Sequence, residues 1–470
     1  MTISIASHLS NGAIAMRDLI FLAFIGAIML GAVKRPFLLV LLYVYIDIVA
    51  PQRLTYGFMT TLPLSAIVVG LAVLAWLAVD DKRDTRVSFR QGLIVLLLGW
   101  CWYTTRGADF PVEALSKWEW VWKALAFAIF LPLTLRTRLR IEALLLFMVL
   151  SISAIAITGG IKTLAGGGGY GSLQLLVADN SGLYEGSIIS TVGIAMIPII
   201  LWFTHSGTIF PPDWRVKLFG YALTFSCLLL PVGTQARTGL LCIGLLAILL
   251  LRDAKRKFLW FTGLALMGAA ALPFLPTAFT NRMDTIGSYK ADASASTRIE
   301  VWKWTWDYAK THPLGGGFEA YRQNYIRYDK VKVDDVAGNN ATVERTLEVD
   351  RGRAYHSAYF EMLGEQGYPG LAMWLLINLG GIWRMEVLRR RYREGAEAWA
   401  GSLASALQHA HMIYMLGAVF VGIAFQPVLF MLVGAQIGLD TYLTRRRKET
   451  TWNPIRRRKR AQPEAAPALG

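Results

Sequence analysis

The chain has 470 residues, of which 54% are hydrophobic and 17% charged, and its formal net charge is +16 at pH 7. Soluble domains carry about a quarter charged residues, so this composition excludes an ordinary soluble enzyme. Apolar segments recur along the chain, which predicts an all-α polytopic membrane protein with about 12 transmembrane helices. The basic residues lie in short turns and in the tail, not in a domain interleaved with aromatic residues. We therefore expect contact with membrane lipid and no binding of nucleic acid.

Shifts in hydropathy divide the chain into five parts. The first contains two apolar runs separated by Lys34-Arg35-Pro36, each short for a full crossing, so they form either two tilted spans or a hairpin that enters the bilayer in part. The predicted parts are 1–61, amino-terminal membrane segments; 62–272, a transmembrane helix bundle; 273–367, a polar loop subdomain with the candidate catalytic residues; 368–443, carboxy-terminal transmembrane helices; and 444–470, a basic cytoplasmic tail.

The distribution of basic residues predicts which face of the membrane each loop occupies. Lys and Arg concentrate in four short turns, at residues 80–90, 136–140, 252–257 and 389–393. A further nine Lys and Arg lie in residues 445–460. By the positive-inside rule these turns and the tail are cytoplasmic. The alternation of spans between them then places the large loop, residues 273–367, outside the cytoplasm.

The sequence predicts no cofactor. The three cysteines lie in apolar segments without the paired spacing of a metal site or a disulfide framework. The glycine-rich run at residues 159–172 lacks the Gly-Lys-Ser/Thr ending of a phosphate-binding loop and follows no strand, so we interpret it as a connector. We therefore expect chemistry without a bound metal or nucleotide.

Three polar residues precede apolar segments on the same face as the large loop. Arg237 is always charged, and its planar donors suit bidentate binding of a diphosphate. An arginine at this position also fits a side chain that extends to the membrane interface. Asp179 and Asn180 precede another apolar segment, where they fit either the cap of that helix or contacts to sugar hydroxyls.

The large loop contains the two other candidates. Arg298 opens an amphipathic stretch that Pro313 ends, which predicts a helix along the membrane surface. His356 precedes a helical pattern that leads into the next apolar segment, so its imidazole is expected at the mouth of the membrane domain. A histidine can act as a general base near neutral pH, whereas a lone histidine in a loop can equally be structural. Glu361, about 140° further around an ideal helix, is not an obvious orienting partner for it.

The runs around these residues resemble a known family. Residues 298–317 contain Arg, Trp and then His-Pro-Leu-Gly-Gly-Gly, and residues 356–370 read His-Ser-x-x-Phe-Glu-x-x-Gly-x-x-Gly-x-x-Gly. Together with Arg237 in an earlier small loop, these runs resemble the O-antigen ligase and O-antigen polymerase superfamily. The block at residues 17–58 looks more specifically like the O-glycosylation ligases associated with exosortase systems. The resemblance covers most of residues 17–443.

The resemblance implies transfer of glycan from an undecaprenyl-diphosphate carrier to an acceptor hydroxyl at the periplasmic face of the bacterial inner membrane. The transfer would be independent of metal and would invert the anomeric carbon. Carried over to this sequence, Arg237 and Arg298 would hold the diphosphate, Arg237 also serving catalysis, and His356 would activate the acceptor. Asp179 and Asn180 would contact a sugar, although a serine follows them where the family's motif has a second asparagine. The implied acceptor is lipid A core, a protein or another glycan.

Two alternatives share parts of this pattern. An O-antigen polymerase would use the same residues to extend a glycan that stays linked to its lipid carrier. A transporter of lipid-linked glycan would need no general base. A transporter should therefore tolerate the substitution His356→Ala, whereas a transferase should lose turnover.

Overall fold

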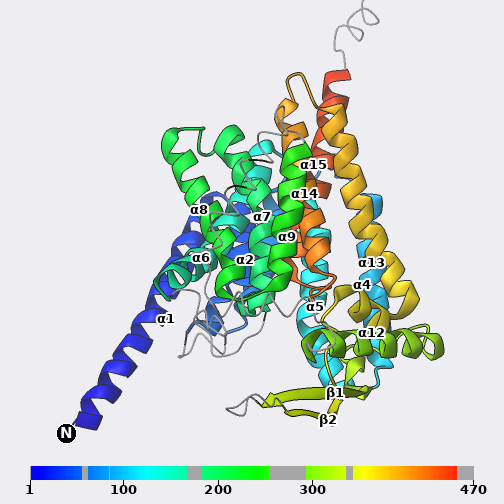
Figure 1. Cartoon of the computed structure of the whole chain (residues 1–470). Coiled ribbons are helices and arrows are strands. Elements are labelled where there is room, and N and C mark those ends of the chain that lie inside the picture. The colour runs from blue at the N-terminus through cyan, green and yellow to red at the C-terminus, as the bar shows by residue number, and fades with distance from the viewer. Residues whose placement is uncertain are drawn as a thin grey trace, which may run out of the picture.

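The computed structural model describes residues 2–55, 62–83, 85–166, 182–252, 262, 266, 293–334 and 342–451. These residues form a helical bundle with one helix, α12, lying across one end and a β-hairpin projecting from there (Figure 1). We call this end of the bundle the loop end. The helices are α1 (Thr2–Lys34), α2 (Phe37–Val49), α3 (Leu64–Val79), α4 (Phe89–Arg106), α5 (Pro111–Thr134), α6 (Arg138–Gly166), α7 (Gly186–Ser206), α8 (Trp214–Gly233), α9 (Arg237–Arg252), α12 (Ala293–Thr311), α13 (Ala358–Arg391), α14 (Ala398–Gly417) and α15 (Pro427–Thr451). Shorter elements are η1 (Pro51–Arg53), η3 (Gly182–Tyr184), η6 (Ala320–Gln323), β1 (Tyr325–Asp334) and β2 (Thr342–Arg351).

Several of these helices have the length and composition of membrane spans. In the described part of the chain five qualify: Arg138–Ala165, Gly186–Ser206, Trp214–Gly233, Ala358–Arg391 and Pro427–Lys448. Helices α2 and α3 are apolar but shorter. The all-α class expected from hydropathy is thus confirmed, whereas the number of about 12 spans remains a prediction. The last part of the bundle predicted at 62–272 lies mostly outside the described residues, because only 262 and 266 are described between 252 and 293.

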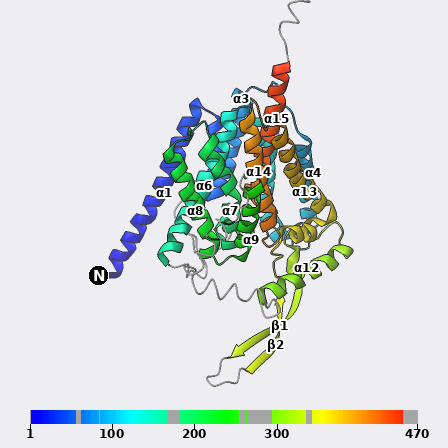
Figure 2. The same cartoon turned by 45° about the horizontal axis from the view of Figure 1, so that its top comes forward.

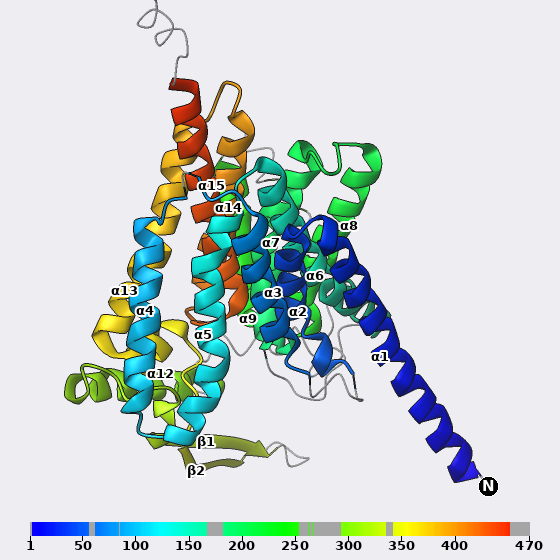
Figure 3. The same cartoon turned by 180° about the vertical axis from the view of Figure 1, so that it is seen from behind.

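Helix boundaries follow local sequence chemistry. The interruption at Lys34-Arg35-Pro36 separates α1 from α2, as the sequence indicated, and α1 extends away from the bundle (Figure 3). The side chain of Ser88 caps α4 by accepting a hydrogen bond from the Gln91 backbone N–H. The Gln91 side chain accepts one from the Ser88 backbone N–H, which completes a capping box. Helix α12 ends two residues before Pro313, which cannot continue a helix.

The core of the bundle is built around α7. This helix packs against α8, α9 and α14 (Figures 1 and 2). In its apolar 18-residue stretch, 83% is buried inside the protein. Its first turn lies at the loop end, directly after Glu185. A second group of helices, α4, α5, α13 and α15, joins the first where α13 and α15 pack against α14. The two groups therefore present their helix ends together at the loop end.

The large loop has its own secondary structure. Helix α12 forms where the sequence predicted a helix and packs against α13, whereas its position along the membrane surface remains a prediction. Strands β1 and β2 pair antiparallel from Tyr325 opposite Arg351 to Asp334 opposite Thr342, and Figure 2 shows this hairpin pointing away from the bundle. The sequence indicated only a polar run here. The described part of the loop is thus a small folded unit held against the start of α13.

Candidate active site

A tryptophan of α12 holds the segment that contains His356. Trp302 donates a hydrogen bond from Nε1 to the carbonyl oxygen of Tyr355 (2.9 Å). Its ring stacks on that of Phe360, with the centroids 5.1 Å apart. Tyr355 directly precedes the histidine and Phe360 follows it by about one helical turn. A single side chain of α12 therefore fixes the chain on both sides of His356.

His356 occupies a strained turn at the start of α13. Its φ is +47°, in the left-handed region that few residues other than glycine adopt. The turn is fixed by a hydrogen bond from the Ala358 N–H to the carbonyl oxygen of Ala418 (2.8 Å). Ser357 stands at the cap position without a capping bond, and its Oγ is buried with no hydrogen-bond partner among the described residues. Strain held by surrounding contacts is typical of functional sites.

Positive charge surrounds the imidazole. Burial, together with the charges of Arg298 and Arg353, lowers the pKa of His356 to about 4. The imidazole is therefore neutral at pH 7, which is the form that can accept a proton. Arg298 also interacts with Glu185, whose pKa is raised by burial while the arginine charge opposes that rise. The structure thus brings two sequence-predicted residues, Arg298 and His356, together and adds a carboxylate from the start of α7.

Arg237 reaches the same end of the bundle by a different route. It begins α9 after a tight turn from α8, in which the Ala236 N–H donates to the carbonyl oxygen of Pro231 (3.0 Å). The hydroxyl of Thr234 in this turn shares a hydrogen bond with that of Ser190 on α7 (2.8 Å). The turn therefore packs on the first turns of α7, and this packing connects Arg237 to the helix that follows Glu185.

Two glycine-rich runs meet back to back beside the site. Gly315 has a φ of +84° and Gly367 a φ of +64°, and a Cβ atom added at either one would overlap backbone atoms of the other segment. The Tyr368 N–H donates to the carbonyl oxygen of Pro313 (3.0 Å), and α13 kinks at Gly367. These glycines therefore permit a close backbone contact, which orients the first half of α13 relative to α12.

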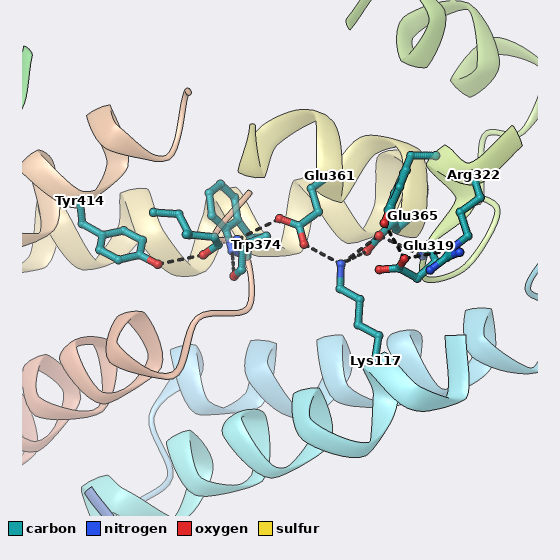
Figure 4. Close-up of polar contacts among 10 residues, drawn as sticks. Lys117, Glu319, Arg322, Glu361, Glu365, Trp374 and Tyr414 are labelled. Carbon is teal, nitrogen blue, oxygen red and sulfur yellow. Dashed lines mark hydrogen bonds and ion pairs between the residues drawn. The ribbon is translucent and has the colours of Figure 1, made fainter. Parts of the chain in front are cut away.

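A buried charge cluster anchors the first half of α13 to α5 (Figure 4). Lys117 Nζ lies 2.7 Å from Glu361 Oε1 and 2.9 Å from Glu365 Oε2, and the lysine side chain is 12% exposed. The Ala424 N–H donates to Glu361 (3.1 Å) and the Glu319 N–H to Glu365 (3.0 Å). Both carboxylates are thus satisfied by a charge and a backbone donor, as buried carboxylates require.

Sequence reasoning missed part of this arrangement. Glu361, which helical geometry set aside as a partner of His356, pairs with Lys117 instead. A lysine and two glutamates near apolar segments are a signal of a specific role, although the signal does not say which side chains pair. Asp179 and Asn180 lie outside the described residues, so their roles remain predictions.

A cavity of about 550 Å³ adjoins Lys117 and Glu361 of the buried charge cluster. It lies between α5, the start of α7, η6, the first half of α13 and the segment before α15, and Glu185 and Glu361 both line it. A cavity of this size, with Glu185 in its wall close to Arg298, can hold the hydroxyl-bearing part of a substrate.

Comparison with known proteins gives this geometry a family context. Residues 222–375 match the O-Antigen ligase family, and residues 16–208 match DUF5935, a family of unknown function. The exopolysaccharide production protein ExoQ of Rhizobium meliloti (strain 1021) is 28% identical over 163 residues, which cover 34% of this chain and 34% of ExoQ. The chain therefore spans about a third of the length of this curated relative. Arg237, Arg298 and His356 all fall within the ligase match. The match of residues 222–375 and the similarity to ExoQ support a relationship to the O-antigen ligase and polymerase superfamily.

Proposed function

We propose that this protein is a membrane glycosyltransferase of the O-antigen ligase type, which moves glycan from an undecaprenyl-diphosphate carrier to an acceptor hydroxyl. The proposed location is the bacterial inner membrane, with the loop end facing the periplasm. The observation that supports this most directly is a neutral His356 beside Arg298, inside a segment that matches the O-Antigen ligase family. The basic turns, placed in the cytoplasm by the positive-inside rule, support the orientation.

The proposed chemistry divides between the imidazole and the two arginines. His356 takes the proton of the acceptor hydroxyl while the acceptor oxygen forms a bond to the anomeric carbon. The bond from that carbon to the diphosphate oxygen breaks on the opposite face, so the configuration inverts. Arg298 and Arg237 stabilise the negative charge that develops on the departing diphosphate.

Binding of the donor would also change the pKa of His356. The charge of Arg298 is one cause of the low pKa of His356. A diphosphate beside Arg298 would offset that charge, which raises the pKa of the imidazole and makes it a stronger base. The proton acceptor would therefore gain strength when the leaving group is in place.

Chain extension on the carrier is the second candidate function. The similarity to a protein named for exopolysaccharide production favours this polymerase activity, in which the acceptor is another lipid-linked glycan. The resemblance of residues 17–58 to ligases associated with exosortase systems favours a protein acceptor instead. Lipid A core is the third acceptor class. A transporter without chemistry would leave the strained, neutral His356 without a role.

The test is glycan transfer by the purified protein in proteoliposomes, supplied with undecaprenyl-diphosphate glycan. Lipid A core, a serine-rich protein and no added acceptor form three parallel reactions. Transfer to one added acceptor would establish a ligase and name its acceptor class. Longer carrier-linked chains without an added acceptor would establish a polymerase. Absence of glycan transfer in all three reactions, with a correctly folded protein, would contradict the proposed function.

A further inference from the structure

A second cavity adjoins the one that Glu185 and Glu361 line. It has a volume of about 430 Å³ and lies between the end of α2, the start of α3, α5, η3 and the start of α15. Trp120, Gly182 and Gln426 line both cavities, so the two lie side by side, and we call them together the Trp120 cleft. Some residues that line it lie in the segment that matches DUF5935, residues 16–208, and others lie in the sequence after that segment. The cleft runs away from Arg298, beginning at Glu185.

Carboxyl groups outnumber cationic groups in the lining of the Trp120 cleft. Its lining carboxylates number five: Asp47, Glu113, Glu185, Glu319 and Glu361. Its lining cations number three: Lys117, Lys123 and Arg322. An anionic group placed here would therefore meet repulsion from the walls.

Each of the three cations already has a carboxylate neighbour. Lys117 lies 2.7 Å from Glu361, and Arg322 lies 3.1 Å from Glu319. Lys123 interacts electrostatically with Asp47. These contacts neutralise the positive charges within the cleft, so an anionic ligand would have to displace a partner that is already in place.

The second cavity also offers hydrogen-bond acceptors without donors. Asp47 Oδ2 and Gln52 Oε1 are buried and have no hydrogen-bond partner among the described residues. Both residues line this cavity. Buried oxygens of this kind require a donor, and the hydroxyl or amino groups of a ligand can supply it.

An aromatic side chain stands where the two cavities meet. Trp120 is 43% exposed, although it lies in a helix packed against α4 and α15. An exposed indole face binds the apolar C–H face of a sugar ring, while carboxylates around it accept the ring's hydroxyl groups. We propose that the Trp120 cleft binds the glycan part of the substrate, and that it takes sugars that are neutral or carry amino groups and rejects sugars that carry carboxylates. This inference rests on the proposed function for the identity of its ligand, but binding requires no turnover.

The test measures binding by the full-length protein in nanodiscs, by calorimetry or saturation-transfer NMR. The probes are three oligosaccharides of equal length and linkage: a cello-oligosaccharide, its glucosamine counterpart and its glucuronate counterpart. We expect the first two to bind at least about tenfold more tightly than the glucuronate, because like charges in a desolvated site repel. Trp120→Ala should weaken binding of the neutral probe by about tenfold, whereas Trp214→Ala, at the other end of the bundle, should leave it unchanged.

A charge substitution tests the selectivity separately. Glu113→Gln should narrow the difference between the neutral and glucuronate probes, while Glu300→Gln on the outer face of α12 should not. Equal or tighter binding of the glucuronate, no binding of any probe, or unchanged binding in Trp120→Ala would overturn the proposal. If the protein binds the probes selectively but transfers no glycan, the proposal for the Trp120 cleft stands and the proposed transferase function is contradicted. The two proposals can therefore fail independently.

Discussion

Arg298 on α12 and His356 before α13 lie close enough for the guanidinium to act on the imidazole. Together with burial, this charge and that of Arg353 bring the pKa of His356 to about 4. The pair joins a residue suited to a diphosphate with a residue suited to proton transfer. This relationship leads to the first prediction.

Removing the charge of Arg298 should change the pH dependence of transfer. In Arg298→Gln one of the two lowering charges is lost, so the pKa of His356 should rise from about 4 towards its ordinary value of 6.5. The acid limb of kcat/KM should then move to higher pH, because it reports the base of the free enzyme. NMR titration of labelled histidines, with His356→Asn to assign the signal, measures the same shift. Arg322→Gln, at the same end of the bundle, should leave the pKa unchanged, and an unshifted pKa in Arg298→Gln would refute the pairing.

Lys117 should be more important for stability than an exposed lysine. Lys117→Met leaves Glu361 and Glu365 buried without their cation, which should lower the free energy of unfolding by about 3–5 kcal/mol. Lys303→Met is the matched control, because its pair with Glu300 is 64% and 43% exposed and such pairs contribute about 0–1 kcal/mol. Thermal unfolding in detergent measures both. Equal melting temperatures for the two variants would contradict the role of the cluster.

The kink in α13 should tolerate no side chain. Gly367→Ala places a Cβ against the backbone at Pro313 and Leu314 and at a φ of +64°. It should destabilise the protein by more than about 1 kcal/mol and reduce transfer. Gly380→Ala, in the same helix, has nothing within 4 Å of the added Cβ and should be neutral or slightly stabilising. If the two alanine variants behave alike, the close backbone contact is not a constraint.

Trp302 should affect turnover only by holding His356 in position. Trp302→Ala removes both the hydrogen bond to Tyr355 and the stack on Phe360, so the turn with His356 loses its fixed geometry. A misplaced base should lower kcat by about 10²-fold. Trp302→Phe, which keeps a ring but no donor, should give an intermediate value. Trp306→Ala, with 52% of its residue surface exposed on the same helix, should retain activity, and a comparable loss there would contradict the specific role of Trp302.

Much of the fold follows from the sequence because its signals are local. Recurring apolar segments predicted the all-α class, and Pro313 marked the end of α12. Lys34-Arg35-Pro36 marked the division between α1 and α2. Such features depend only on neighbouring residues, so periodicity and turn chemistry reveal them.

The site depends on contacts that no local pattern encodes. The pairing of Lys117 with Glu361 joins residues on α5 and α13, and the interaction of Glu185 with Arg298 joins α7 and α12. The sequence shows which charges lie near apolar segments but not which helices are neighbours. The candidate residues His356 and Arg298 could therefore be named from motifs, whereas the side chains that position them required the three-dimensional structure.

The most direct test of the proposed chemistry is single-turnover glycan transfer by His356→Asn. Asparagine tolerates the left-handed backbone that His356 adopts at φ +47°, so this variant should fold where alanine would be strained. Binding of the lipid-linked donor and thermal unfolding serve as controls for an intact site. We expect donor binding to be retained while the transfer rate falls by about 10²- to 10⁴-fold, the usual contribution of a general base. An undiminished rate would show that His356 is not the proton acceptor.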